Sequence, residues 1–286
     1  MNQNHGEDLK ESQKAGGILL EAKGLKKSFP RGGGIFAGDG NTAEGKNFMA
    51  VDGVSLTVLQ GETLAIVGES GCGKTTLARM LLRLIEPEEG KILFCGRDLL
   101  KLAAAELRVA RREMQMIFQD PFASLNPRMR VGEIVGEPLA IHEAKLSRSE
   151  RQARTVAMME RVGLQGEALQ RYPHEFSGGQ RQRIGIARAL ILRPKLVVAD
   201  EPVSALDVSI GAQVLLLLQE LQSEFGLTYI FISHSLPVVA QVATRIAVMN
   251  AGRFVEIGEA KQVLKRPENE YTKELLAAVP EAAAGT

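Results

Sequence analysis

A glycine-rich stretch between an apolar run and a helical pattern constrains the fold of this sequence more than any other feature. Residues 63–67 (TLAIV) predict a buried strand, residues 68–75 read GESGCGKT, and residues 76–84 (TLARMLLRL) have the apolar spacing of a helix. A strand, a glycine-rich loop ending in Lys and Thr, and then a helix form the context that a P-loop requires. We therefore expect a phosphate-binding loop at this position.

The residue types of this loop suit the phosphates of a nucleotide. Glycines let the backbone N–H groups converge on phosphate oxygens, Lys74 adds a positive charge for the β and γ phosphates, and Thr75 offers a hydroxyl to Mg²⁺. A random chain of this length matches the pattern in about 1% of cases, so a chance glycine-rich turn is the weaker interpretation. The expected nucleotide-binding residues here are Gly68, Ser70, Gly71, Cys72, Gly73, Lys74, Thr75 and Thr76.

Cys72 allows two interpretations. A helix N-terminus lowers the pKa of a nearby thiol, which predicts an alkylation of Cys72 that bound nucleotide slows. Alternatively, Cys72 is a small residue that only fills space.

The other strand-like runs predict an α/β domain with a largely parallel sheet. They lie at residues 91–94, 115–118, 196–199 and 228–232, and helical patterns alternate with them. Between Phe118 and Pro194 the pattern is helical only, with VGEIVGEPLAIH, SRSERQARTVAMMERVGL and a helix from about Gly178 to Leu192. Such an interruption predicts an inserted helical subdomain.

Polar segments without periodicity set the predicted boundaries. The first 18 residues and the closing EAAAGT are expected to be tails, and residues 30–47 are expected to be a long glycine-rich loop between two strands. The predicted parts are an N-terminal tail (1–18), a main domain (19–280) with its core at 19–118 and 190–262 and its helical subdomain at 119–189, and a C-terminal helix and tail (263–286).

Composition argues against several classes of function. Lys and Arg number 35 and Asp and Glu 34, so the net charge of +1 gives no field that favours nucleic acid, and none is expected as a partner. No apolar run approaches the roughly 20 residues of a membrane-spanning helix. The start of the sequence lacks the apolar core of a signal peptide, and the 2 cysteines are too few for a disulfide framework. A cytosolic chain is expected.

Two adjacent carboxylates close the apolar run KLVVADE at residues 195–201. Asp200 is placed to hold the Mg²⁺ shell, and Glu201 is placed to orient and polarise the attacking water. A lone pair of acids after a strand more often caps a helix or faces solvent, but the P-loop favours the catalytic interpretation.

The segment FSGGQRQR at residues 176–183 resembles a motif that is specific to one family. Ser177, Gly178, Gly179 and Gln180 resemble the signature motif of the ABC (ATP-binding cassette) ATPases, and they also suit the start of a helix. The resemblance implies a RecA-like P-loop NTPase core with an antiparallel β edge. It also implies that Ser177 and Gly179 face the γ-phosphate of ATP held by the P-loop of an opposite subunit.

The remaining motifs of that family follow in order along nearly the whole chain, from about residue 19 to 279. Gln119 at the end of MQMIFQ resembles the Q-loop glutamine of the Mg²⁺ shell, Asp207 ends the D-loop-like SALD, and His234 after TYIFIS resembles the switch histidine. Phe29 stands where the family has an aromatic that stacks on adenine, although Phe36 competes for that role and either could be a loop or core residue.

The long loop after SFP, the stretch QDPFASLNPRMRVG (119–132) and the ending RPENEYTKELLAAVP (266–280) resemble ATPase subunits of dipeptide, oligopeptide and nickel importers. The resemblance implies a second ABC ATPase subunit, identical or paralogous, two permease subunits, an extracytoplasmic solute-binding protein, and a peripheral position on the cytoplasmic face of the inner membrane. Phe122 and Leu125 are candidates for docking a permease, or for ordinary packing of the helical subdomain.

Two other classes of function remain as alternatives. Soluble ABC ATPases of DNA repair carry long insertions between Q-loop and signature, and those of translation usually fuse two cassettes, and this sequence matches neither description. A regulatory module without catalysis would tolerate the loss of a base or switch residue, whereas Glu201 and His234 are both present.

Overall fold

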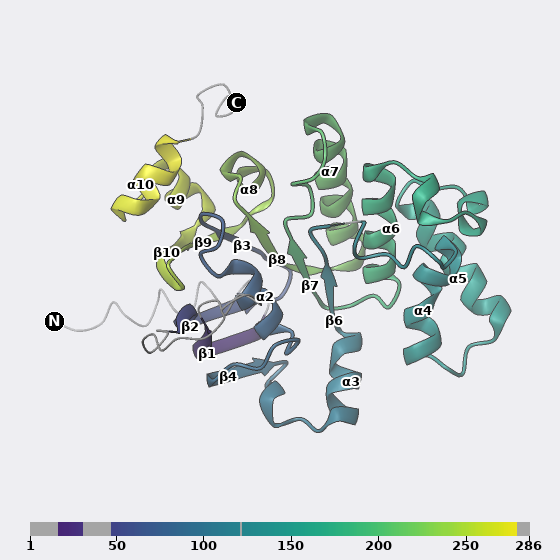
Figure 1. The fold of residues 1–286 in the computed structure, drawn as a ribbon, viewed down its shortest axis with the longest axis horizontal. Helices are drawn as coiled ribbons and strands as arrows, with labels where there is room; N and C mark the ends of the chain where they lie inside the picture. Colours follow the sequence, from purple (N-terminus) through teal and green to yellow (C-terminus); the bar gives the residue numbers. More distant parts are fainter. Residues whose placement is uncertain (1–16, 31–46, 121, 279–286) are drawn as a thin grey trace, which may run out of the picture.

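The computed structural model describes residues 17–30, 47–120 and 122–278, which fold around two sheets (Figure 1). The larger sheet has six strands in the order β10-β9-β3-β8-β7-β6. All neighbours pair in parallel except β10, which is antiparallel to β9. Its strands are β3 (Thr63–Val67), β6 (Met114–Ile117), β7 (Leu196–Asp200), β8 (Thr228–Ser233), β9 (Arg245–Asn250) and β10 (Arg253–Glu259).

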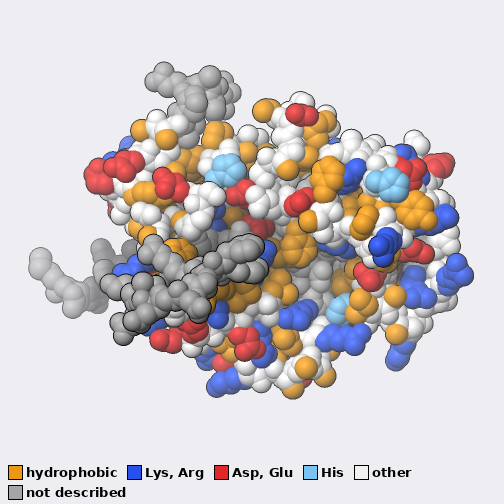
Figure 2. Space-filling model, viewed as in Figure 1, with side chains coloured by type: hydrophobic (Ala, Val, Ile, Leu, Met, Phe, Trp, Pro, Cys, Tyr) orange, Lys and Arg blue, Asp and Glu red, His pale blue; other side chains and the backbone are white. Residues whose placement is uncertain are grey.

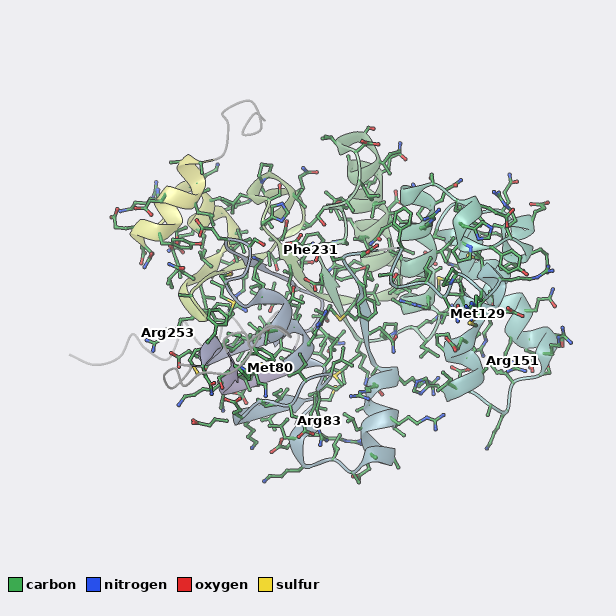
Figure 3. All side chains as sticks on the ribbon, viewed as in Figure 1. Met80, Arg83, Met129, Arg151, Phe231 and Arg253 are labelled. Atoms are coloured by element: carbon green, nitrogen blue, oxygen red, sulfur yellow. The ribbon has the colours of Figure 1, made fainter. Side chains whose placement is uncertain are left out.

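The parallel core confirms the α/β fold expected from the sequence. Strands β3, β7 and β8 are buried along their whole length, because helices cover both faces of the sheet. Phe231 of β8 is among the largest fully buried side chains and lies near the centre of the molecule (Figure 3). Continuous apolar runs, rather than alternating ones, were therefore the correct signal for these strands.

The second sheet is antiparallel and has the order β2-β1-β4-β5. Its strands are β1 (Ile18–Phe29), β2 (Phe48–Leu59), β4 (Glu89–Phe94) and β5 (Arg97–Asp98). Strand β1 begins at Ile18, and the Gly17 carbonyl accepts a hydrogen bond from the Gln60 N–H at 3.0 Å. The expected tail (1–18) therefore extends one residue into β1, whose Leu19 and Leu20 belong to the core.

Helix α2 (Lys74–Leu81) packs between the two sheets. Its buried residues Leu77, Met80 and Leu81 belong to one apolar cluster with strands of both sheets. The strand before the glycine-rich loop and the helix after it are thus both fixed by core packing, which leaves the loop between them held at both ends.

The stretch that the sequence predicts to be helical forms three α-helices and two short 3₁₀ turns on the side of β6 (Figure 1). Ser147 begins α5 with a side-chain cap on the Glu150 N–H, and Ser177 caps α6 in the same manner. These helices share an apolar cluster with β7, β8 and α7. Their bounds are α4 (Val131–His142), α5 (Arg148–Arg161), α6 (Gly178–Leu190) and α7 (Val208–Phe225), with the turns at Gly166–Gln170 and Pro173–Glu175.

The remaining helices are α3 (Ala104–Arg112), α8 (Leu236–Val242), α9 (Ala260–Lys265) and α10 (Glu270–Ala277), with a 3₁₀ turn at Leu99–Lys101. A third apolar cluster joins α8, α9 and α10 to β3 and β9. Within the part of the chain that the structure describes, no helix has the length and apolarity needed to cross a bilayer. Figure 2 shows Lys and Arg side chains interleaved with acidic and hydrophobic ones, in keeping with a net charge of +1.

Candidate functional site

The glycine-rich loop crosses from the end of β3 to the start of α2 and lies against two other strands. A Cβ on Gly73, whose φ is 110°, would fall inside the carbonyl of Ala50 on β2. A Cβ on Gly68 would likewise overlap the carbonyl of Met249 on β9. Only glycine allows the backbone to approach these strands so closely, so the path of the loop is fixed by its neighbours.

The ammonium group of Lys74 lies inside this loop and contacts its backbone. Lys74 is buried, and its Nζ donates hydrogen bonds to the carbonyls of Gly68 and Glu69, each at 2.7 Å. A buried charge needs such partners to offset its desolvation. The loop thus curls around the ammonium, as a cradle for phosphate requires.

Asp200 ends strand β7 and Glu201 follows it. In the sheet, β7 lies two strands away from β3, the strand that leads into the loop. Asp200 is 3% exposed and accepts a hydrogen bond from the Thr75 hydroxyl at 3.2 Å. Burial raises the pKa of Asp200 above its ordinary value, although the hydrogen bond from Thr75 opposes this shift. A cation beside Asp200 and Thr75 would relieve the cost of the buried carboxylate.

The Glu201 carboxylate contacts two side chains, Gln119 and His234, that come from distant parts of the chain. Its Oε2 accepts a hydrogen bond from Gln119 Nε2 at 2.9 Å, and its Oε1 lies 3.1 Å from His234 Nδ1. Glu201 also has a φ of 46°, a left-handed conformation that costs a non-glycine residue about 1 kcal/mol or more. The Glu201 N–H donates to the Ile232 carbonyl at 2.9 Å, which helps to hold the residue in this conformation.

These residues surround one pocket of about 640 Å³. Of the residues singled out in the sequence, it is lined by Phe29, Gly68, Ser70, Gly71, Gly73, Lys74, Thr75, Thr76, Gln119, Glu201 and His234. A triphosphate along the loop would therefore lie near the Glu201 carboxylate, with space for a nucleoside toward Phe29. Phe36 lies outside the described residues.

Four lining residues were missed in the sequence, namely Phe48, Ala50, Glu69 and Leu275. Phe48 is the cross-strand partner of Phe29, and both aromatic rings are exposed. The available signal for Phe48 was an aromatic residue directly after the glycine-rich sequence of residues 30–47, at the start of an apolar run. Leu275 comes from α10, and no local pattern connects that helix with the loop.

The signature residues do not line this pocket. Ser177 caps α6, since its Oγ accepts the Gln180 N–H at 3.3 Å while Gln180 Oε1 accepts the Ser177 N–H at 3.0 Å. A Cβ on Gly179 would overlap Ile210 of α7, so the starts of α6 and α7 are packed together. Ser177, Gly178, Gly179, Gln180 and Asp207 consequently belong to a second surface, where Ser177 and Asp207 are accessible.

The surroundings of Cys72 do not favour the reactive thiol of the first interpretation. Burial raises the pKa of this thiol and outweighs the opposing effect of Lys74, and the residue is 7% exposed. The space-filling interpretation is therefore the one that fits, because desolvation exceeds the effect of the neighbouring charge and the helix start.

The two cysteines differ in accessibility, and we expect iodoacetamide to alkylate Cys95 at least about tenfold faster than Cys72, with or without ATP. Cys95 is exposed and Cys72 is buried. Peptide mapping after timed labelling measures both rates, and labelling in denaturant, where the rates should converge, is the control. Rapid labelling of Cys72 that ATP suppresses would restore the reactive-thiol hypothesis.

Of the two interpretations of Leu125, the structure supports packing of the helical subdomain. It is 2% exposed and belongs to the apolar cluster of the helical subdomain, because the segment after Gln119 folds its leucine inward. Phe122 is 59% exposed, and the Arg181 guanidinium lies 4.0 Å from the centre of its ring. Only Phe122 of this pair is available to a partner.

Comparisons with known proteins found a matching family and similar relatives. Residues 51–204 match the protein family described as ABC transporter. The oligopeptide transport ATP-binding protein OppF of Salmonella typhimurium is 57% identical over 235 residues, which cover 82% of this chain and 70% of that protein. The dipeptide transport ATP-binding protein DppF of Haemophilus influenzae is 50% identical over 262 residues, covering 92% of this chain and 78% of that protein.

Solved structures are similar over most of the fold. A dimeric ATP-binding cassette, MJ0796, in a post-hydrolysis state with ADP and Pi has a TM-score of 0.73 and 28% identity, covering 85% of this chain and 99% of that one. The cassette cbiO1 of Clostridium perfringens, part of the transporter complex cbiONQ, also has a TM-score of 0.73, with 25% identity over 93% of this chain and 98% of its own.

Proposed function

The chain belongs to the ABC transporter family, whose cassettes bind and hydrolyse ATP, and we propose that it powers the uptake of dipeptides or oligopeptides. The high identity to relatives named as peptide transport ATP-binding proteins carries this proposal, because it extends over most of the chain and beyond the nucleotide-binding core. The cargo itself is selected by other subunits, so the inference rests on similarity.

ATP is proposed to bind in the pocket of about 640 Å³, with its phosphates on the loop and its nucleoside toward Phe29. The donor set of Thr75, Asp200 and Gln119 fits Mg²⁺, since hydroxyl, carboxylate and amide oxygens are the ligands that this ion prefers. When bound, Mg²⁺ would neutralise charge on the β and γ phosphates. Lys74 would give up carbonyl contacts in exchange for phosphate oxygens.

Glu201 is proposed to orient and polarise the attacking water, with Gln119 and His234 as the groups that position its carboxylate. Gln119 Nε2 donates a hydrogen bond to the carboxylate at 2.9 Å, and His234 Nδ1 lies 3.1 Å from its other oxygen. In this role the carboxylate accepts a proton as the water attacks the γ-phosphate, while His234 contacts the phosphate. Gln119, Glu201 and His234 follow β6, β7 and β8, and the parallel pairing of these adjacent strands keeps the three groups in register.

A head-to-tail pair of cassettes is proposed as the working unit. In a single chain, Ser177 and Asp207 are accessible and do not line the pocket, whereas the family mechanism requires a signature beside each γ-phosphate. A second subunit, identical or paralogous, would supply that half of the site. ATP contacts both faces and so favours the closed pair, and phosphate release weakens it.

The assembly is proposed to include two permease subunits and an extracytoplasmic solute-binding protein, with this chain peripheral on the cytoplasmic face of the inner membrane. Phe122, exposed after the Q-loop glutamine, is the remaining docking candidate for a permease. Nucleic acid is not proposed as a partner.

Uptake in cells carrying a chromosomal Glu201→Gln substitution tests the cargo. Labelled dipeptide, oligopeptide and Ni²⁺ are supplied separately, and uptake is compared with the wild type and with a strain lacking the chain. We expect peptide uptake to fall to the level of the deletion strain and Ni²⁺ uptake to remain unchanged. Loss of Ni²⁺ uptake with intact peptide uptake would assign the chain to a nickel importer, and no change in either would point to a soluble function.

A further inference from the structure

Helix α10, close to the C-terminal end of the described residues, reaches the nucleotide pocket. The Tyr271 hydroxyl accepts a hydrogen bond from the Glu69 backbone N–H at 3.3 Å, across 202 positions of sequence. One helical turn further along, Leu275 lines the pocket together with the loop and Phe29. Two residues on the same face of α10 thus meet the loop and the space beside it.

The position of α10 is fixed by its own contacts. The Glu256 carboxylate on β10 accepts hydrogen bonds from the Glu268 N–H at 3.0 Å and the Asn269 N–H at 3.1 Å. Asn269 then caps the helix through the Tyr271 N–H at 3.0 Å. Figure 1 shows α10 beside α9 at the end of the larger sheet where β10 lies.

Apolar packing also fixes helix α10. Tyr271, Leu275 and Leu276 are half-buried and pack on the cluster that contains Val248 of β9 and Val263 of α9. The helix is therefore attached to the core through the sheet, independently of its contact with the loop. A contact between two separately fixed elements can hold the loop in one conformation.

The contact from α10 is made at Glu69, a residue of the loop whose backbone has a second partner. Its carbonyl accepts a hydrogen bond from Lys74 at 2.7 Å, and its N–H is directed to Tyr271. The peptide units before and after Glu69 are therefore both fixed. Partial burial raises the pKa of Tyr271, so the phenol stays protonated and keeps a donor of its own.

We propose that α10 is part of the nucleotide site: Tyr271 positions the loop through the Glu69 amide, and Leu275 forms a wall of the pocket that contacts bound adenine nucleotide. This inference rests on the proposed binding of ATP in the pocket. It assigns to the C-terminal segment a share in nucleotide affinity, with Tyr271 as a positioning residue and Leu275 as a contact residue.

Substitutions in the full-length chain test both roles. Tyr271→Phe removes only the hydroxyl, and Leu275→Ala removes the wall together with core packing of the kind that Leu276 also provides. Leu276→Ala is the matched control, because Leu276 packs on the same cluster from the same helix and does not line the pocket. The affinities for ATP and ADP are measured by equilibrium titration, and the unfolding midpoint of each variant is measured in parallel.

We expect the Kd for nucleotide to rise roughly two- to tenfold in Tyr271→Phe and in Leu275→Ala, the usual scale for one neutral hydrogen bond or one apolar contact. Leu276→Ala should bind nucleotide as the wild type does, even if its unfolding midpoint falls. Wild-type affinity in both test variants would overturn the proposal, and so would an equal loss in Leu276→Ala, since that would be a general effect of loosening the helix.

The wild type and Lys74→Ala separate this proposal from the function on which it rests. If the wild-type chain binds no ATP, or if Lys74→Ala binds it equally well, the proposed nucleotide site itself is wrong. If the wild type binds ATP, Lys74→Ala does not, and the two α10 variants match the wild type, only the role of α10 is overturned.

Discussion

Glu201→Gln is expected to lower ATP turnover of the assembled transporter by at least about a hundredfold while ATP binding is retained, the usual scale for the loss of a positioned base. The amide keeps the size of the side chain and one oxygen, so it can still accept the Gln119 hydrogen bond that measures 2.9 Å in the native chain. It cannot accept a proton from water. The substitution therefore removes the proposed proton acceptor and leaves a side chain of the same size at the pocket.

Steady-state turnover and equilibrium binding of ATP, measured on the same preparation, separate the two effects. Glu113→Gln is the matched control, because Glu113 pairs with Lys195 at 2.8 Å and does not line the pocket. It should leave turnover unchanged. Near-normal turnover in Glu201→Gln would remove Glu201 from the proposed role, and loss of ATP binding would show that the residue supports the pocket instead.

Local patterns were sufficient to predict the sheet core and the helical insertion. The predicted strand at residues 63–67 is strand β3 to the residue, and VGEIVGEPLAIH is helix α4. The local signals for these parts of the fold are strong. They are the continuous apolar run of β3, the glycines next to Lys74, and the serine caps of α5 and α6 in the helical insertion. Each element is specified mainly by its own residues, so tertiary structure has little to overrule.

Contacts between distant segments could not be predicted in this way. Leu275 reaches the nucleotide pocket and Phe48 pairs with Phe29, yet neither residue differs in type from many others in the chain. Leu125 and Cys72 were judged by their neighbours in sequence, whereas burial by distant elements decides the accessibility of both and raises the pKa of the Cys72 thiol. Such properties depend on how elements pack, which periodicity alone does not encode.

The three residues proposed to act in catalysis lie between these two cases. Gln119, Glu201 and His234 each follow a predicted strand, and parallel strands present their carboxyl ends at one edge of a sheet. Their proximity could thus be expected from the α/β topology together with the resemblance to the family. The contacts that make Glu201 the centre of the three, a hydrogen bond from Gln119 and the close approach of His234, become evident only in the structure, as does its left-handed backbone.

Ser177→Asp should abolish ATP-driven closure of the cassette pair and leave the separate chain intact. Aspartate caps a helix about as well as serine, so the start of α6, where the Ser177 Oγ accepts the Gln180 N–H, remains capped. The new carboxylate would face the γ-phosphate held by the opposite subunit. Two like charges about 4 Å apart repel by about 4 kcal/mol at an effective dielectric constant of about 20, which corresponds to roughly a thousandfold in affinity.

Ser177→Asn is the matched control for this substitution, since asparagine has the same size as aspartate, caps equally well and carries no charge. Turnover of the assembled transporter and ATP-dependent dimerisation in a Glu201→Gln background are the measurements. Turnover should fall at least about a hundredfold in Ser177→Asp and far less in Ser177→Asn, while both separate chains bind ATP and unfold like the wild type. Because only the charge distinguishes the two variants, equal turnover would mean that no phosphate lies opposite Ser177 and that each chain completes its own ATP site.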